Sequence, residues 1–170
     1  VSGHRQGHTL MSWRAAVIGC GRIGCAFDDD PNRTQISTHA GAYANTPGVD
    51  LVALADLDPA TLDRYGDHYG VPGRYLDHRA LLERESPDIV SVCTPSSSHA
   101  AIVRDAAESG VKVIFCEKPL ADRGVDGRQT VALCDRLGVL LLVNHKRRFS
   151  PFHQAIAAFL RSGRLGKIQQ

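Results

Sequence analysis

The sequence predicts an α/β protein built on a doubly wound parallel sheet. Short runs rich in Val, Ile, Leu and Ala alternate with longer segments of helical character. Each short run is apolar at successive positions, which is typical of a strand covered by helices on both faces. Strands that alternate with helices predict right-handed βαβ units and hence a parallel sheet.

Five strands are predicted, at Arg14–Gly19, Leu51–Ala55, Ile89–Thr94, Val111–Cys116 and Val139–Val143. Six helical segments are predicted, at Ser37–Asn45, Pro59–Tyr69, Asp77–Glu85, Ser97–Ser109, Asp122–Leu137 and Pro151–Ser162. Asp58 is the expected N-cap of the Pro59 helix. Gly110 and Gly138 stand where two helices are expected to end, because glycine accepts the left-handed backbone there.

Composition restricts the class of protein. The chain has 170 residues, 43% of them hydrophobic and 22% charged, as in an ordinary globular domain. A net charge of +2 argues against a nucleic-acid or acidic-membrane partner, and no apolar run approaches the ~20 residues of a membrane span. The five cysteines are odd in number and form no CxxC pair, so we expect no metal site, no disulfide framework and a cytoplasmic location.

The segment between the first two strands is longer than a usual crossover. It contains the run Asp28-Asp29-Asp30-Pro31-Asn32, which is interpreted as a loop. The acidic residues suggest either a metal site or a solvated loop at the rim of a cleft. The solvated loop is favoured, because three adjacent aspartates cannot all face one ion from a regular element.

A glycine-rich turn follows the first strand and is expected to open a helix. It contains the residues Gly19, Cys20, Gly21, Arg22, Ile23 and Gly24. In a GxGxxG turn the first glycine permits the tight turn, the second lets a pyrophosphate approach, and the third lets the helix pack on the sheet. We therefore predict a Rossmann fold that binds a dinucleotide through this turn, with its free N–H groups facing the pyrophosphate. A glycine turn without a ligand and an S-adenosylmethionine methyltransferase are the alternatives.

Asp56 ends the second strand, where an acidic residue completes the dinucleotide fingerprint. Its carboxylate is expected to accept hydrogen bonds from the adenosine ribose hydroxyls. A 2′-phosphate would face this negative charge, and Leu57 and Asp58 supply no cation to offset it. The sequence therefore favours NAD over NADP.

Two further motifs come at the ends of the predicted strands Ile89–Thr94 and Val111–Cys116. They are Thr-Pro-Ser-Ser-Ser-His-Ala, which begins at Thr94, and Glu-Lys-Pro-Leu-Ala, which begins at Glu117. Both lie beyond the carboxyl ends of strands, where open α/β sheets bind their ligands. Lys118 either projects a cation into the cleft or is a solvated surface lysine.

Taken together, GCGRIG, Asp56, TPSSSHA, EKPLA and NHKRRFSP resemble the glucose–fructose oxidoreductase/inositol dehydrogenase (Gfo/Idh/MocA) family, from about Trp13 to Ile168. The resemblance implies a two-domain, homo-oligomeric, NAD(P)-dependent oxidoreductase of sugars, sugar derivatives or cyclitols. It implies that Lys118 contacts cofactor and substrate and is catalytic. Further cofactor contacts are implied for Thr94, Pro95, Ser96, His99 and Glu117. Arg148 and Phe149 fall near the implied domain junction.

Residues 1–10 precede Met11 and are expected to be a leader. The resemblance implies an NAD-binding domain at 11–150, and a linking helix with the start of a second domain at 151–170. The resemblance places the acid/base residues in the second domain. Within this chain, His145 is a candidate for the acid/base role. It either faces the cleft or packs at the domain boundary. His153 lies on a helix whose apolar face is expected to be core.

Three functions stay open at this point. The chain is the cofactor domain of an enzyme that transfers a hydride to or from a secondary alcohol, an enzyme completed by a partner chain, or a stand-alone NAD-binding module. In the last case it is a redox sensor or partner subunit without catalysis of its own.

Overall fold

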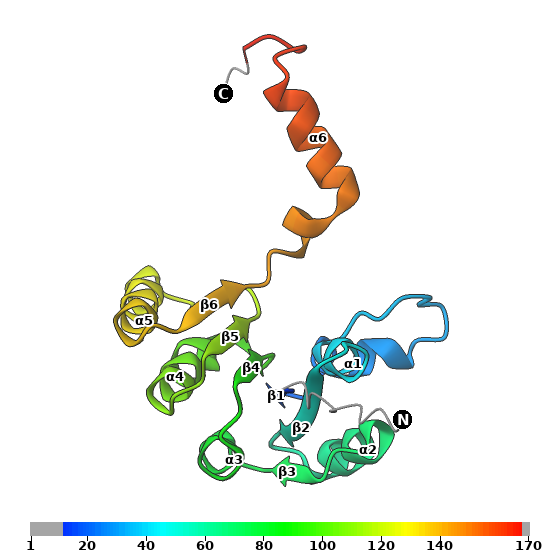
Figure 1. Cartoon of the computed structure of the whole chain (residues 1–170), viewed down its shortest axis with the longest axis vertical. Helices are drawn as coiled ribbons and strands as arrows, with labels where there is room; N and C mark the ends of the chain where they lie inside the picture. Colours follow the sequence, from blue (N-terminus) through cyan, green and yellow to red (C-terminus); the bar gives the residue numbers. More distant parts are fainter. Residues whose placement is uncertain (1–11, 168–170) are drawn as a thin grey trace, which may run out of the picture.

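A computed structural model describes residues 12–167 and confirms the predicted α/β fold (Figure 1). Six parallel strands form one sheet in the order β3-β2-β1-β4-β5-β6. Their bounds are β1 Trp13–Ile18, β2 Val49–Ala55, β3 Gly73–Tyr75, β4 Ile89–Val92, β5 Val113–Cys116 and β6 Leu140–Val143. The chain reverses its direction across the sheet between β3 and β4, so the carboxyl ends of β1, β2 and β4 border the crevice where such sheets bind ligands.

Helices cover both faces of the sheet. Their bounds are α1 His39–Ala44, α2 Pro59–Tyr69, α3 His78–Glu85, α4 Ser96–Glu108, α5 Gly124–Leu137 and α6 Pro151–Arg161. Val17 and Leu54 pack with α1 and α2 in one buried cluster, whereas Ala16 and Ile18 pack with α3 and α4 in the other. Neighbouring strand residues therefore point to opposite cores, which explains the continuous apolar runs.

Most predicted elements are confirmed within a few residues. The Asp58 side chain accepts hydrogen bonds from the first turn of α2, and Gly138 ends α5 with φ 69°. β3 lies outside the predicted strands because its sequence, Gly-Arg-Tyr, contains no apolar run. It pairs only with β2, at the edge of the sheet.

The prediction that the glycine turn opens a regular helix is wrong. Beyond Gly24 the chain forms turns and a short 3₁₀ helix, η1 (Ala26–Asp29), before a loop leads to α1. Pro31 explains the interruption, because proline disfavours a helical conformation of the preceding residue. Asp30 accordingly has extended backbone angles, φ −75° and ψ 112°.

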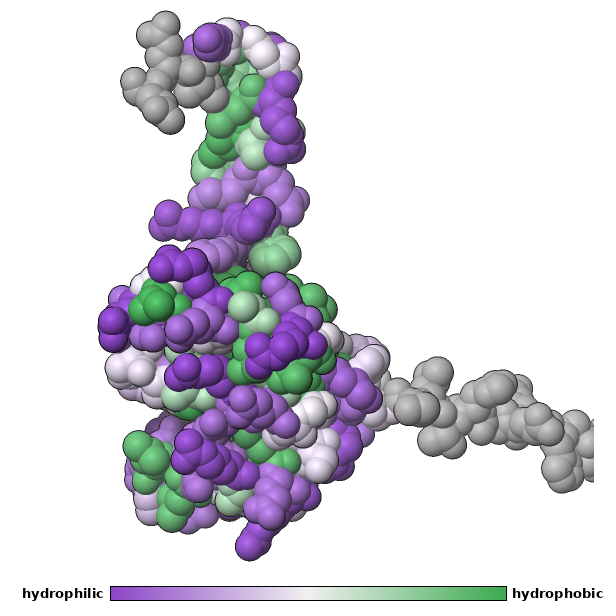
Figure 2. Space-filling model, turned by 90° about the vertical axis from the view of Figure 1, so that its left-hand side faces the viewer, coloured by the Kyte–Doolittle hydropathy of each residue, from purple (hydrophilic) through white to green (hydrophobic). Residues whose placement is uncertain are grey.

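The helix α6 projects away from the sheet, beyond a second 3₁₀ helix, η2 (Lys146–Phe149) (Figure 1). It buries no residue, so the expectation that its apolar face is core is wrong. Figure 2 shows hydrophobic side chains along one side of this helix. Its large exposed side chains are Phe152, Ile156, Phe159 and Leu160.

The predicted leader at 1–10 lies outside the described residues. None of the helices between residues 12 and 167 has the length and apolar character needed to cross a membrane.

Candidate functional site

The three glycines of the turn have different surroundings. Gly19 has φ +95°, and a Cβ there would lie 2.7 Å from the carbonyl carbon of Cys93. A Cβ on Gly24 would lie 1.9 Å from the Gly19 carbonyl oxygen, so both positions are closed to a side chain. A Cβ on Gly21 would meet no atom within 4 Å. Only the second glycine therefore faces open space, at the place where a phosphate group would approach.

The same turn presents unpaired backbone donors. Within residues 12–167, the amide groups of Gly21, Arg22, Ile23 and Gly24 donate no hydrogen bond. The next amide, that of Cys25, bonds to the Gly21 carbonyl at 2.9 Å. Successive free N–H groups in a turn form a concave site for an anion. The turn can therefore hold a pyrophosphate without a regular helix behind it.

Asp56 is fixed directly beneath the glycine turn. Its Oδ2 accepts a hydrogen bond from the Cys20 amide at 2.7 Å, and its Oδ1 accepts one from the Asp58 amide at 3.0 Å. A carboxylate offers about four lone-pair sites, so these two bonds leave acceptor capacity for ribose hydroxyls.

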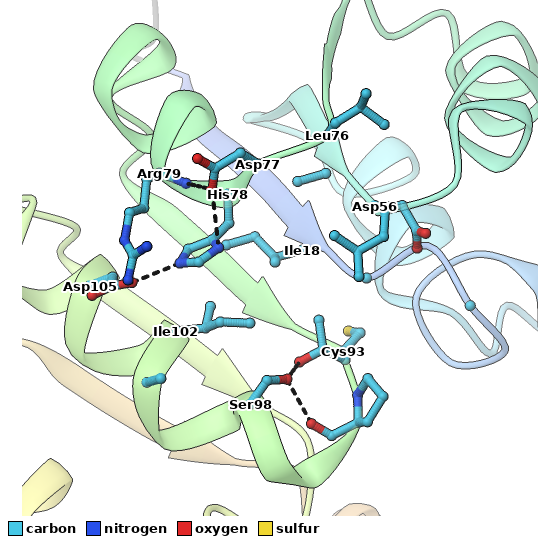
Figure 3. A pocket seen from close by; sticks show the side chains of 17 residues that line it. Ile18, Asp56, Leu76, Asp77, His78, Arg79, Cys93, Ser98, Ile102 and Asp105 are labelled. Atoms are coloured by element: carbon cyan, nitrogen blue, oxygen red, sulfur yellow. Dashed lines mark hydrogen bonds and ion pairs between the residues drawn. The ribbon is translucent and has the colours of Figure 1, made fainter.

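A cavity of about 650 Å³ opens beside Asp56, at the carboxyl ends of β1, β2 and β4 (Figure 3). Thr94 and Pro95 line it, as do Gly19 and Gly21. The predicted contacts Ser96 and Glu117 are not among its lining residues. The volume falls within the range of pockets that enclose small ligands, about 300–1,000 Å³.

The opposite wall of this cavity carries charged residues that the sequence analysis missed. His78 Nε2 lies 2.8 Å from the Asp105 carboxylate, and the Arg79 guanidinium lies 3.0 Å from it (Figure 3). His78 and Arg79 stand at the start of α3, just after β3. The unrecognised strand β3 is why their place at the ligand-binding edge was not predicted.

A second cavity, of about 390 Å³, is lined by Ile23 from the end of the glycine turn. Its floor includes His39, Phe115 and Asn144, and its rim includes the exposed Arg33 and Lys146. The glycine turn therefore contributes to both cavities. An extended ligand that crosses the turn would enter one cavity with each end.

Glu117 lies behind this second cavity and is held from three sides. Its Oε1 accepts hydrogen bonds from His39 Nε2 at 3.2 Å and from the Asn144 side-chain amide. Its Oε2 accepts one from the Lys118 backbone amide at 3.3 Å. Burial raises the pKa of this carboxyl group, but the bonds from His39 and Asn144 outweigh burial, and the net pKa is below its usual value. The Lys118 side chain, on the next residue, is exposed.

His99 is buried, with 1% of its surface exposed, and it connects the two motif loops. Its Nδ1 lies 2.7 Å from the Pro119 carbonyl oxygen, and its Nε2 lies 2.7 Å from the Thr94 carbonyl oxygen. Both ring nitrogens face protein acceptors, so neither is left for a cofactor. His99 therefore holds the Thr94 and Lys118 loops together. This role differs from the cofactor contact that was expected of it.

The acidic run is only partly a solvated loop. Asp28 accepts hydrogen bonds from the Ser37 amide, at 2.6 Å, and from the Thr38 hydroxyl. Asp29 accepts one from the Tyr65 hydroxyl on α2, also at 2.6 Å. These two aspartates tie the inserted segment to α1 and α2, because they diverge toward separate partners. Asp29 and Asp30 are nevertheless exposed, as expected of a solvated loop, whereas Asp28 is half-buried.

The last motif is placed at the edge of this region. Asn144 and Lys146 line the second cavity, whereas His145, Arg148 and Phe149 are exposed and lie outside its lining. His153 is exposed on α6. The structure therefore brings neither histidine substitute into the site.

A glycine turn over an acidic strand end, between two ligand-sized cavities, is the arrangement expected of a dinucleotide-binding domain. In agreement, residues 13–145 match the Gfo/Idh/MocA oxidoreductase family with an NAD-binding Rossmann fold. The chain belongs to this family, which confirms the resemblance drawn from the motifs.

Individual relatives agree with this assignment. The chain is 35% identical to a D-apiose dehydrogenase of Paraburkholderia graminis, covering 93% of this chain and 39% of the relative. It is 31% identical to an inositol 2-dehydrogenase of Rhizobium meliloti, covering 94% of this chain and 44% of the relative. The chain thus spans about two fifths of the length of these relatives.

Solved structures show the same fold. An oxidoreductase from Agrobacterium radiobacter, in complex with NAD+, L-tartaric acid and magnesium, superimposes with a TM-score of 0.77 at 31% identity, covering 92% of this chain and 42% of that one. The WlbA dehydrogenase of Bordetella pertussis, in complex with NADH and UDP-GlcNAcA, gives a TM-score of 0.79 at 27% identity. The match covers 92% of this chain and 44% of that one.

Proposed function

We propose that this chain is the cofactor-binding part of an NAD-dependent oxidoreductase that acts on a secondary alcohol of a sugar, sugar derivative or cyclitol. The observation that carries the proposal is the bond between Asp56 and the glycine turn, with a cavity on each side of that turn. Family membership supports the cofactor class. The sugar and cyclitol named for two relatives, D-apiose and inositol, support the substrate class.

The residues present fit a dinucleotide. The larger cavity takes the adenosine half, with its ribose hydroxyls on Asp56. The four free amides from Gly21 to Gly24 take the pyrophosphate, and the open space at Gly21 admits it. The smaller cavity takes the nicotinamide half, against Ile23 and Phe115.

The same arrangement favours NAD over NADP. Asp56 would place a negative charge beside a 2′-phosphate, which costs binding energy. Arg79 lines the opposite wall as a candidate cation, but its guanidinium is paired with Asp105 at 3.0 Å. The cavity therefore offers an additional phosphate little net attraction.

The nicotinamide, when bound, supplies the hydride acceptor or donor. We assign to Lys118 a hydrogen bond to the reacting hydroxyl, where its charge would stabilise negative charge that develops on the oxygen. Glu117 fixes the backbone beneath that lysine through the Lys118 amide. We further propose that a second domain, beyond the 11–150 unit, supplies the acid/base residue and most of the substrate pocket, and that the segment 151–170 leads into it.

Calorimetric titration of the 170-residue chain tests this proposal. NAD+ and NADH are expected to bind more tightly than NADP+ and NADPH. The reverse order would remove the assigned role of Asp56, and binding of none of the four would overturn the proposed function. The chain alone is expected to turn over sugars and cyclitols negligibly, which a nicotinamide absorbance assay measures.

A further inference from the structure

A buried polar network lies under α1, behind the nicotinamide-side cavity. His39 Nδ1 lies 2.8 Å from Ser91 Oγ, and the Tyr43 hydroxyl lies 2.7 Å from the same oxygen. Through Nε2, His39 continues to Glu117, which also bonds to Asn144. Ser91 is fully buried and His39 is 6% exposed. Buried polar groups are costly unless they are bonded, and here each one has a partner.

The two ends of this network are a carboxylate and a phenol hydroxyl. Glu117 is ionised, because its pKa is lowered, and a carboxylate only accepts, so His39 Nε2 donates to it. Burial raises the pKa of Tyr43 to about 12, partly opposed by its bond to Ser91, so its proton is retained. The network therefore runs from a protonated Tyr43 hydroxyl, through Ser91 and His39, to the accepting carboxylate of Glu117.

The inserted segment between the glycine turn and α1 fixes the position of His39. Asp28 accepts from the Ser37 amide and the Thr38 hydroxyl, and the Thr38 oxygen caps the first turn of α1 at 3.0 Å. His39 is the first residue of that helix. Asp28 of the acidic run therefore helps to hold the His39 imidazole between β4 and the end of β5.

We propose that His39 is a positioning residue for the nicotinamide end of the cofactor. It acts through Glu117, whose second oxygen holds the Lys118 amide, and it lines the cavity assigned to the nicotinamide. The inference rests on the proposed function. It predicts that loss of His39 selectively weakens ligands that carry a nicotinamide.

The test compares NADH with ADP-ribose, which lacks the nicotinamide, on the 170-residue chain. His39→Leu should raise the Kd for NADH about tenfold, as expected when a carboxylate loses a buried donor, and leave that for ADP-ribose within about twofold. His39→Gln should recover part of the NADH affinity, because its amide can still donate to Glu117. The fluorescence of bound NADH should shift in the Leu variant and return toward wild type in the Gln variant.

His78→Leu is the matched control, because His78 lines the adenosine cavity that both ligands share. It should change the two affinities by the same factor. Asn144→Ala, at the end of β6, removes the other side-chain donor to Glu117. It is the replacement variant if His39→Leu does not fold. It should also weaken the binding of NADH more than that of ADP-ribose.

An unchanged ratio of the NADH and ADP-ribose affinities in the His39→Leu variant would overturn the inference, whether both affinities stay at the wild-type value or both weaken by the same factor. If His39→Leu does not fold, an unchanged ratio in Asn144→Ala decides against it in the same way. The proposed function fails separately, if the wild-type chain binds neither ligand.

Discussion

The two ends of the candidate cofactor cleft are built in different ways. At the proposed adenosine end, Asp56 accepts hydrogen bonds from the Asp58 amide, two residues along the chain, and from the Cys20 amide of the glycine turn, beside a broad open cavity. At the nicotinamide end, Glu117 is held by His39 and Asn144, which lie 78 and 27 residues away in the sequence. The first end is built mainly from two recognisable motifs that follow β1 and β2, and the second from the packing of α1 and the end of β6 against Glu117.

The comparison predicts that the nicotinamide end controls rate. In a longer protein that carries this chain and turns over substrate, Lys118→Ala should lower kcat by about a factor of 100, as for removal of one donor to a developing oxyanion. The Kd for NADH should change little, because the lysine side chain is exposed and its backbone contact to Glu117 is retained. Steady-state kinetics and fluorescence titration measure the two quantities.

Lys112→Ala is the control for that experiment. Lys112 is an exposed lysine that precedes β5, the strand that leads to Lys118, and it pairs with Asp88 at 2.7 Å. Its loss should leave kcat unchanged. If the Lys118 variant turns over substrate at the wild-type rate, Lys118 is a solvated surface lysine and not a catalytic residue.

The glycine turn joins the two ends, and its glycines should respond differently. Gly21→Ala places a methyl group in open space, so it should leave the melting temperature unchanged while lowering NADH affinity about tenfold. Gly24→Ala places it 1.9 Å from a backbone oxygen and should cost roughly 1–3 kcal/mol of stability. Thermal melts with and without NADH separate these effects. Equal loss of stability in both variants would contradict the assignment of a ligand to the Gly21 side.

The adenosine end should control cofactor choice. Asp56→Asn keeps an oxygen that can accept from the Cys20 amide but removes the charge. The preference for NAD+ over NADP+ should fall about tenfold, an effect of about 1.4 kcal/mol. Calorimetry with both cofactors measures the ratio. Asp58→Asn, at the exposed cap of α2, should leave it unchanged; a ratio unaffected by Asp56→Asn would remove the selectivity role.

The sequence predicts the fold well where one local signal decides it. The Asp58–Pro59 start of α2 and the Gly138 end of α5 are examples, since capping depends on residues within one turn. The signal fails where tertiary pairing decides. β3 has only three residues and exists because the edge of β2 is available to it.

The residues of the candidate site show the same difference between local signals and tertiary pairing. Gly21 and Asp56 follow strand ends and are visible as a motif. The role of His99 differs from the expected one, because its partners, the Thr94 and Pro119 carbonyl oxygens, are brought to it only by the packing of α4. The pairing of His39 with Glu117 joins two crossovers of the sheet, and nothing in the spacing of the two residues indicates it.

The smallest expected effect concerns the pH dependence of stability at the nicotinamide end. The pKa of Glu117 is lowered in the folded chain, by hydrogen bonds from His39 and Asn144 that exceed the opposing effect of burial. A carboxyl group with a depressed folded pKa stabilises the fold above its unfolded pKa, and this contribution is lost as the pH falls through the folded value. The loss should therefore begin near pH 4.5, the ordinary value, and continue below it. Urea unfolding of wild type and Glu117→Gln over this range should show a shallower decline in the variant, and equal slopes would show that Glu117 carries no such coupling.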